Sequence, residues 1–493
     1  MIKALKVHEK FLYEIWKEQN FKKGLTSKNG EQIAIIGVGV ENKELGGPDF
    51  KNARIKIGNI TYLGDVEIDS YYTDWKAHGH HLNKKYNKVI LHAVLNDDLN
   101  HNYVYTQNGR KVQSISIHAF IKDNLKENIQ KAILSERKNR LNKMPCFDLN
   151  DIITDQEKLD FLYSLGIVRF KDKCDKMMHR LKEITYLREM NLKEPVIQYD
   201  LDEKFYNQNF TQEDFNKKEI WMQLIYESVF ESLGYSKNKV IMQNLAKAVD
   251  IDLISNFSGA EHFVLIVESI LFNVSGIIPD VEKLPDEETS GYTKKLVEYW
   301  SNITSSYDGK IFHAAQWHFF RLRPQNFPTI RIAGGARILK RIIKENLITD
   351  FISKIERIKD LNQLTRELKT LLIVKGEGFW HDHFVFDQPA KNPINYFVGS
   401  SRADEILINI MFPIFFIYFE VFSKRELSEK VIKLFVNYYQ KSENNLVKNV
   451  SLALHLSDAW KRSVIYQGMI ELFRSYCTHE KCLECNIGKK VFN

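Results

Sequence analysis

Short apolar runs that alternate with polar residues dominate the first 120 positions of the chain. An amphipathic segment in the first 20 residues predicts a helix, and strand-like runs follow at IAIIGVG, ARIKIGNITYLGDVEID and SISIHAF. Gly58-Asn59 divides the second run where a hairpin turn is expected. The run Val89–Leu95 is continuously apolar, which is typical of a central strand. This part therefore predicts a small α/β domain.

Beyond about Asp123 the apolar positions recur at helical spacing and strand signals become rare. A chain of 493 residues exceeds the roughly 250–300 at which a single core stops growing. We therefore expect an α/β domain at residues 1–125 and an all-α region at residues 126–493, with a candidate internal boundary near residues 280–293. The expected helices are Asn124–Arg140, Asp155–Lys182, Glu219–Leu233, Lys239–Ala248, Ala260–Leu271, Thr293–Ser301, Ala336–Glu345, Arg402–Phe422, Ser428–Gln440 and Asp458–Tyr476.

The net charge of +7 is concentrated at the start of the chain. Residues 1–140 hold 23 Lys and Arg against 16 Asp and Glu, and the remainder of the chain is balanced. Such an excess attracts polyanions, although a solvated surface of this charge is equally ordinary. Nucleic acid, either DNA or RNA, is the partner that the charge favours.

The most apolar stretch, Ile406–Phe422, indicates a buried core helix. Its unbroken apolar core, Ile410–Phe419, is far shorter than the roughly 20 residues that span a bilayer. The amphipathic, charged start of the chain does not resemble a secretory signal. Five cysteines in this length do not indicate a disulfide framework. We expect a cytoplasmic protein with no membrane partner.

Carboxylates gather between residues 44 and 69. Asp49 follows two glycines and Pro48, and Asp65, Glu67 and Asp69 alternate along the next strand-like run. A period of two places these three on one face, with Val66 and Ile68 toward the core. A hairpin that joins Asp49 to Glu67 would form a site of hard oxygen ligands for Mg²⁺ or Mn²⁺.

Four histidines, His78, His80, His81 and His92, follow closely. His78 and His80 flank Gly79 and are the favoured candidates for a metal-binding or proton-transfer role. A zinc hydrolase that acts on a small molecule would use such nitrogens as ligands. The structural alternative is that one or two are hydrogen-bonded histidines beside the cleft.

The segment resembles the PD-(D/E)xK nuclease superfamily, which has a restriction-endonuclease-like mixed sheet. The matching residues are Glu14 on the first helix, Pro48-Asp49, Glu67 on the following strand and the later VILHAVL strand. The resemblance implies a metal-dependent nuclease in which Asp49, Glu67 and Glu14 hold the ion. The lysine of the family motif is Asp69 here.

That departure leaves three functions open. The first is a metal-dependent nuclease in which Lys56, Lys76 or His78 takes the place of the motif lysine. In it, Lys76, His78 and His80 assist the catalytic pair Asp49 and Glu67 in activating water. The alternatives are a degenerate nuclease fold that binds nucleic acid without cleaving it, and the zinc-dependent hydrolase.

The chain also resembles, nearly end to end, an uncharacterised bacterial family, domain-of-unknown-function family 2851. The resemblance rests on GPDF, GDVEI, the DW-x-x-H-x-H run, RPQNFPTIRIAGGA, NIMFP and the cysteine-rich tail.

The tail contains Cys477, Cys482 and Cys485, a C-x4-C-x2-C spacing suited to zinc or an iron–sulfur cluster. Cys146 is the preferred fourth ligand, with His479 and Cys174 as alternatives. Free thiols at the terminus are the structural alternative.

An arginine-rich segment, Arg321–Arg341, contains Arg323, Arg331 and Arg337 beside prolines and glycines. These side chains would contact the phosphates of a nucleic acid, or would pair with acidic neighbours and fix the packing of the domain.

Overall fold

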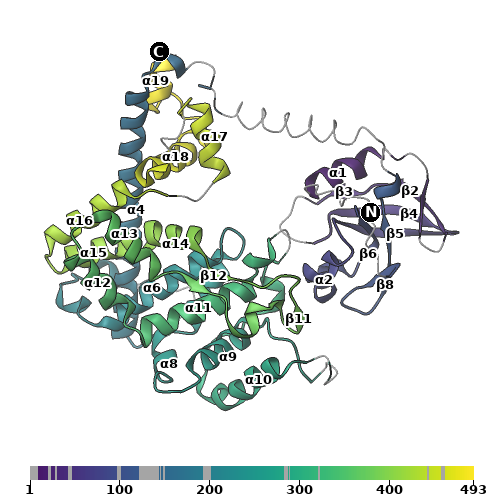
Figure 1. The fold of residues 1–493 in the computed structure, drawn as a ribbon, viewed down its shortest axis with the longest axis horizontal. Coiled ribbons are helices and arrows are strands. Elements are labelled where there is room, and N and C mark those ends of the chain that lie inside the picture. Colours follow the sequence, from purple (N-terminus) through teal and green to yellow (C-terminus); the bar gives the residue numbers. More distant parts are fainter. Residues whose placement is uncertain are drawn as a thin grey trace. The chain divides into compact units, whose positions relative to one another are not determined.

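The structure, a computed structural model, comprises two compact units (Figure 1). The first unit is residues 1–137 with 315–327, and the second is residues 138–314 with 328–493. The structure describes residues 9–19, 21, 24–27, 30–42, 47–96, 101–120, 144, 146–147, 150–192, 201, 203–282, 287, 289–319, 322–440, 444–456 and 461–492. The expected boundary at 125/126 and the expected helix Asn124–Arg140 lie outside these residues, and the candidate boundary near 280–293 falls within the second unit.

A mixed eight-stranded sheet forms the centre of the first unit. Its strands run in the order β1-β2-β4-β5-β6-β8-β7, with β3 paired to β4. The pairs β2–β4 and β4–β5 are antiparallel, whereas β6 runs parallel to both β5 and β8. The strands are β1 (Leu25–Thr26), β2 (Gln32–Gly37), β3 (Val40–Glu41), β4 (Phe50–Ile57), β5 (Ile60–Asp69), β6 (Val89–Val94), β7 (Tyr103–Tyr105) and β8 (Lys111–Ser116).

The alternation in β5 separates an apolar face from a polar one, as the sequence predicts. Val66 and Ile68 pack with Leu12 and Trp16 of helix α1 (Glu9–Glu18) in one hydrophobic cluster. The chain crosses from β5 to β6 through α2 (Asp74–Ala77) and two single turns, η1 (His80–Leu82) and η2 (Lys84–Tyr86). This crossover contributes Trp75 and Tyr86 to a second cluster. The expected turn at Gly58-Asn59 is present, since Ile57 pairs with Ile60.

The second unit is mainly helical, as expected. Two small antiparallel pairs, β9–β12 and β10–β11, interrupt it; their strands are β9 (Val374–Lys375), β10 (His383–Val385), β11 (Gln388–Pro389) and β12 (Tyr396–Val398). The helices are α4 (Asp155–Glu189), α5 (Glu203–Asn207), α6 (Lys218–Leu233), α7 (Lys239–Ala248), α8 (Ile251–Ser255), α9 (Phe263–Ser275), α10 (Gly291–Ile303), α11 (Pro328–Ile343), α12 (Leu347–Arg357), α13 (Leu361–Thr370), α14 (Ser400–Ile406), α15 (Phe412–Val421), α16 (Arg425–Asn437), α17 (Asn445–Ala453), α18 (Ser463–Ser475) and α19 (Asn486–Phe492).

The longest helix, α4, packs along α18 near the end of the chain (Figure 1). The start of α4 is fixed by a capping box, in which Thr154 and Glu157 satisfy each other's backbone N–H groups. The two helices approach closely at glycines: a Cβ atom on Gly166 would lie 2.0 Å from the carbonyl oxygen of Val464, and one on Gly468 would lie 1.9 Å from that of Leu162. Only glycine permits this approach.

The apolar segment predicted as one buried helix, Arg402–Phe422, contains a π-helical stretch, Leu407–Met411, between α14 and α15. Pro413 has no N–H to donate to the carbonyl of Asn409, which disfavours regular α-helical bonding at this place. None of the described helices is both long enough and apolar enough to cross a membrane.

Helix α11 begins earlier than the sequence predicts. It starts at Pro328, whereas the expected helix starts at Ala336. Gly334 and Gly335 lie inside the helix, where ideal Cβ atoms would be 3.0 Å from Phe397 and 2.5 Å from Phe230. Close packing on these rings therefore outweighs the low helix propensity of glycine.

Candidate metal centre

Asp49, Glu67 and Asp69 lie buried on the polar side of β5 and at the start of β4. Their exposed fractions are 1%, 0% and 1%. The backbone N–H of Asp49 donates to Glu67 Oε2 at 3.1 Å, and the N–H of Ile68 donates to Asp49 Oδ2 at 2.9 Å. The strands that carry the two predicted carboxylates are thus linked through backbone N–H groups, whereas the group of described ligand atoms that could hold an ion is formed by Asp69, His78 and His80.

Helix α1 contributes Tyr13, whose hydroxyl donates to Asp49 Oδ1. Sequence reasoning did not single out this tyrosine, although it precedes the candidate Glu14. The backbone of Glu14 belongs to α1, but its side chain lies outside the described part of the chain.

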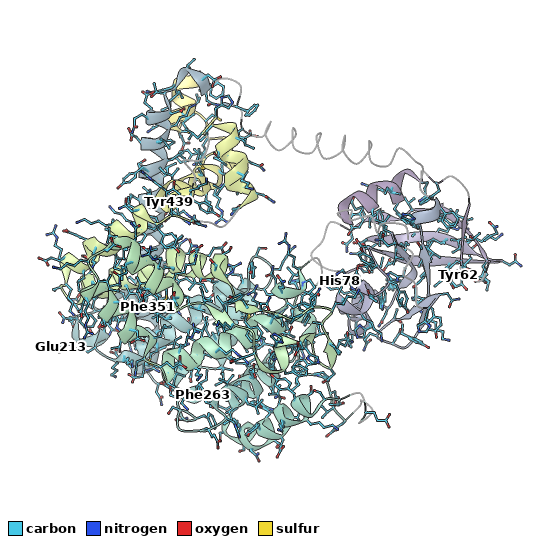
Figure 2. All side chains as sticks on the ribbon, in the orientation of Figure 1. Tyr62, His78, Glu213, Phe263, Phe351 and Tyr439 are labelled. Atoms are coloured by element: carbon cyan, nitrogen blue, oxygen red, sulfur yellow. The ribbon has the colours of Figure 1, made fainter. Side chains whose placement is uncertain are left out.

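Two imidazoles complete the cluster. His78 caps α2 and His80 begins η1, and Gly79 between them has a left-handed φ of 75° that turns the chain. His78 Nδ1 lies 3.0 Å from Asp69 Oδ1, and His80 Nε2 lies 3.0 Å from Glu67 Oε1 and 3.8 Å from Asp69 Oδ2. One ligand atom from each of Asp69, His78 and His80 lies within 4.8 Å of the other two, so these three residues could hold a metal ion. Figure 2 labels His78 on the first unit.

A surrounding layer fixes these groups. His92 on β6 places Nε2 3.1 Å from Asp69 Oδ2 and Nδ1 3.0 Å from the hydroxyl of Ser114 on β8. The ring of His80 stacks on Tyr86 with centroids 4.1 Å apart and meets Trp75 edge-on. Neither His80 nor Asp69 can rotate without breaking these contacts.

The cluster favours a carboxylate at Asp69 and a neutral imidazole at His80. Burial alone would raise the pKa of Asp69, but the charge of His78 and hydrogen bonds from His78 and His92 hold this pKa well below its usual range. Burial lowers the pKa of His80 well below its ordinary value, although Asp69 opposes this shift. Both side chains are therefore in the protonation states that bind cations.

The candidate lysines of the first unit lie in different places, and Lys56 is at the opposite end of β4 and β5 from Asp49 and Asp69. Lys76 is exposed on α2, and burial together with the charge of Lys76 lowers the pKa of His81 to about 4. Lys56 is exposed near the hairpin end of β4, toward Ile57. Lys84 and Lys85 of η2 are also exposed; sequence reasoning missed them, although the KK pair four residues after His80 was a visible signal.

Two of the candidate phosphate-binding arginines are buried in the second unit. Arg337 pairs with Glu268 at 2.7 Å and with Glu377 at 2.9 Å. Arg331 donates to the Tyr235 hydroxyl at 2.8 Å and to the carbonyl of Phe397. These contacts match the packing alternative. Arg323, which belongs to the first unit, is exposed.

The cysteines of the tail meet Cys146 within the second unit. Cys146, Cys477, Cys482 and Cys485 line one small cavity. Cys174 lies elsewhere on α4, where its sulfur contacts the carbonyl of Pro413 at 3.9 Å. His479 is not among the residues that line the cavity.

The chain is thus a two-unit α/β and α protein with a buried carboxylate–imidazole cluster in its first unit. It belongs to the family described as "Protein of unknown function (DUF2851)", whose sequence profile matches residues 9–194 and 183–445. The resemblance to this family is therefore confirmed over residues 9–445, a range that does not include the cysteine-rich tail. No curated protein and no solved structure matches the chain significantly.

Proposed function

We propose that the first unit is a divalent-metal-dependent phosphodiesterase that cleaves nucleic acid, a variant of the PD-(D/E)xK nucleases. The observation that carries this proposal is the cluster in which Asp69, His78 and His80 present three ligand atoms within 4.8 Å of one another, beside Glu67.

The order of elements supports this class. Helix α1 precedes the antiparallel strands β2, β4 and β5, and a short helical crossover then leads to β6, parallel to β5. The PD-(D/E)xK resemblance implies the same succession: a helix, the PD strand, the (D/E) strand, then a helix and a strand. Asp49 and Glu67 stand at the two acidic positions of that motif.

Within this proposal the residues have roles that differ from those in the nuclease motif. Asp69, at the lysine position, becomes a ligand together with His78 and His80. Asp49 holds Glu67 through its backbone N–H, and Glu67 directs Oε1 at His80. Imidazole with carboxylate suits Mn²⁺ better than Mg²⁺, because Mg²⁺ prefers oxygen ligands alone.

A divalent ion at this place would polarise a phosphoryl oxygen and lower the pKa of a bound water. The side chain of His78 is 12% exposed, whereas that of His80 is 1% exposed. His78 is therefore the ligand imidazole that reaches solvent.

The same three residues favour a second candidate, a zinc-dependent hydrolase. Three protein ligands that leave an open position are typical of catalytic zinc. Zinc-dependent hydrolysis of small esters or amides, without cleavage of nucleic acid, would select this candidate.

The test is cleavage of plasmid DNA and single-stranded RNA by the full chain with Mn²⁺, Mg²⁺ or Zn²⁺. Glu67→Gln and Asp69→Asn remove charge with little change of shape, and we expect each to slow cleavage by about 100-fold or more. Asp65→Asn is the matched control, because Asp65 is buried on the same face of β5 but accepts from the N–H of Asn52.

Cleavage that survives Asp69→Asn at the rate of the Asp65→Asn control would refute the proposal. Salt-sensitive binding of nucleic acid without cleavage under any of the three ions would instead support the degenerate nuclease fold.

A further inference from the structure

Four cysteines from opposite ends of the second unit line one cavity. Cys146 precedes α4, Cys477 lies in the turn η13 (Cys477–His479), and Cys482 and Cys485 precede α19. The rest of the wall is largely apolar: Met144, Leu454, Leu472, Tyr476, Ile487 and Gly488. All four cysteines are free of disulfides.

Hydrogen bonds to the backbone hold the segments that carry these cysteines in place. The side-chain amide of Asn150, which is fully buried, donates to the carbonyls of Cys146 and Ala453, both at 2.8 Å. The ammonium group of Lys158 donates to the carbonyl of Leu454 at 3.0 Å. In the tail, a Cβ atom on Gly488 would lie only 2.1 Å from the carbonyl oxygen of Cys482, so glycine permits the compact loop.

We propose that Cys146, Cys477, Cys482 and Cys485 bind a thiolate-ligated metal centre that ties the C-terminal segment to the start of α4. This site is separate from the carboxylate–imidazole cluster and does not depend on the function proposed for it. Four soft sulfur ligands are the donor set of structural zinc and of iron–sulfur clusters.

The size of the cavity bears on which metal it takes. Its volume of about 20 Å³ has room for little more than one water-sized particle, which favours a single ion over a cluster. A single ion held by four thiolates is the arrangement of structural zinc.

The experiment measures zinc, iron and acid-labile sulfide in the full chain purified without oxygen, together with its visible absorption. Asp69→Asn is included throughout so that an ion at the first site does not add to the count. We expect either about one zinc or about four iron with four sulfide per chain. Zinc identifies a mononuclear site, and brown iron-containing protein identifies a cluster.

Cys146→Ser and Cys482→Ser should each lower the bound metal about tenfold or more, whereas Cys174→Ser, at the buried cysteine of α4 outside the cavity, should not. If the serine variants fail to fold, Co²⁺ titration of the metal-stripped Asp69→Asn chain replaces them, and sulfur-to-cobalt absorption bands are expected. Absence of those bands, metal far below one equivalent, or full metal content in a folded Cys146→Ser protein would overturn the proposal.

Discussion

Asp69 occupies the centre of the carboxylate–imidazole cluster. It is the one carboxylate within 4 Å of all three imidazoles His78, His80 and His92 among the described residues. A lysine here would repel a cation, whereas a carboxylate attracts one. Together with the ring nitrogens of His78 and His80, Asp69 offers a mixed nitrogen and oxygen donor set.

The orientation of His92 gives a test of this arrangement. Ser114→Ala removes the hydroxyl beside His92 Nδ1, which loosens the ring that positions Asp69. Loss of such an outer partner typically lowers metal affinity about 10- to 100-fold. We expect a loss of this size for Mn²⁺ in titration calorimetry. Ser116→Ala, two residues along the same strand, is the control, and equal affinities for the two variants would contradict the prediction.

Sequence reasoning could find part of this site. Asp49, Glu67, His78 and His80 stand out because a strand period and a short motif are local properties. The roles of Tyr13 and His92 depend on where α1 and β6 lie against β5, which is a long-range property. A period of two assigns Asp69 to a face but does not show which imidazoles meet it.

At the scale of elements, the packing of α4 against α18 depends on two glycines, Gly166 and Gly468, which have no side chain. Gly468→Ala would place a methyl group 1.9 Å from the carbonyl oxygen of Leu162, so the helices must separate. Overpacking of this kind costs about 1–3 kcal/mol, which exceeds the gain of about 1 kcal/mol in helix propensity. We expect a lower free energy of unfolding in denaturant titrations.

The matched control for this prediction is Gly291→Ala. Gly291 begins α10, and an added Cβ atom would meet no atom within 4 Å. Its stability should be unchanged or slightly raised. Equal effects of the two substitutions would show that the close approach of α4 and α18 is unimportant for stability.

The elements that sequence predicts best are those with strong local patterns. The hairpin β4–β5, the central strand β6 and helix α7 lie where the pattern places them. The start of α11 was predicted too late because Gly334 and Gly335 read as a break, and only their packing against Phe230 and Phe397 reveals their role. Six of the described helices, α5, α8, α12, α13, α17 and α19, were not predicted.

At the scale of the whole molecule, the positive charge of the first 140 residues coincides with the unit that carries the cluster. Lys84 and Lys85 are exposed on the crossover that also bears His80. Exposed positive charge and a member of the candidate site therefore share one short crossover of the first unit.

Removal of these lysines should weaken binding of DNA in a salt-dependent way. Lys84→Ala/Lys85→Ala should reduce the slope of log K against log salt by up to about 1.8, because each phosphate that a lysine no longer neutralises lowers the slope by about 0.9. Lys294→Ala/Lys295→Ala, an exposed pair on α10 of the second unit, is the control. Fluorescence anisotropy across salt concentrations measures both, and identical slopes would contradict the assignment.

Long-range organisation is the least predictable from sequence. The change from strands to helices was visible in the pattern, but the grouping of residues 315–327 with the first unit was not. The spacing of the tail cysteines indicated a fourth partner from elsewhere in the chain, and Cys146, the preferred candidate, lines the same cavity.

The pairing of α4 with α18 also has a consequence for biosynthesis. Helix α4 leaves the ribosome well before its partner, which begins only at Ser463. During this interval the face of α4 that bears Leu162 and Gly166 lacks its native cover on the nascent chain. Premature termination before Ser463 would leave that face permanently open to chaperones and proteases.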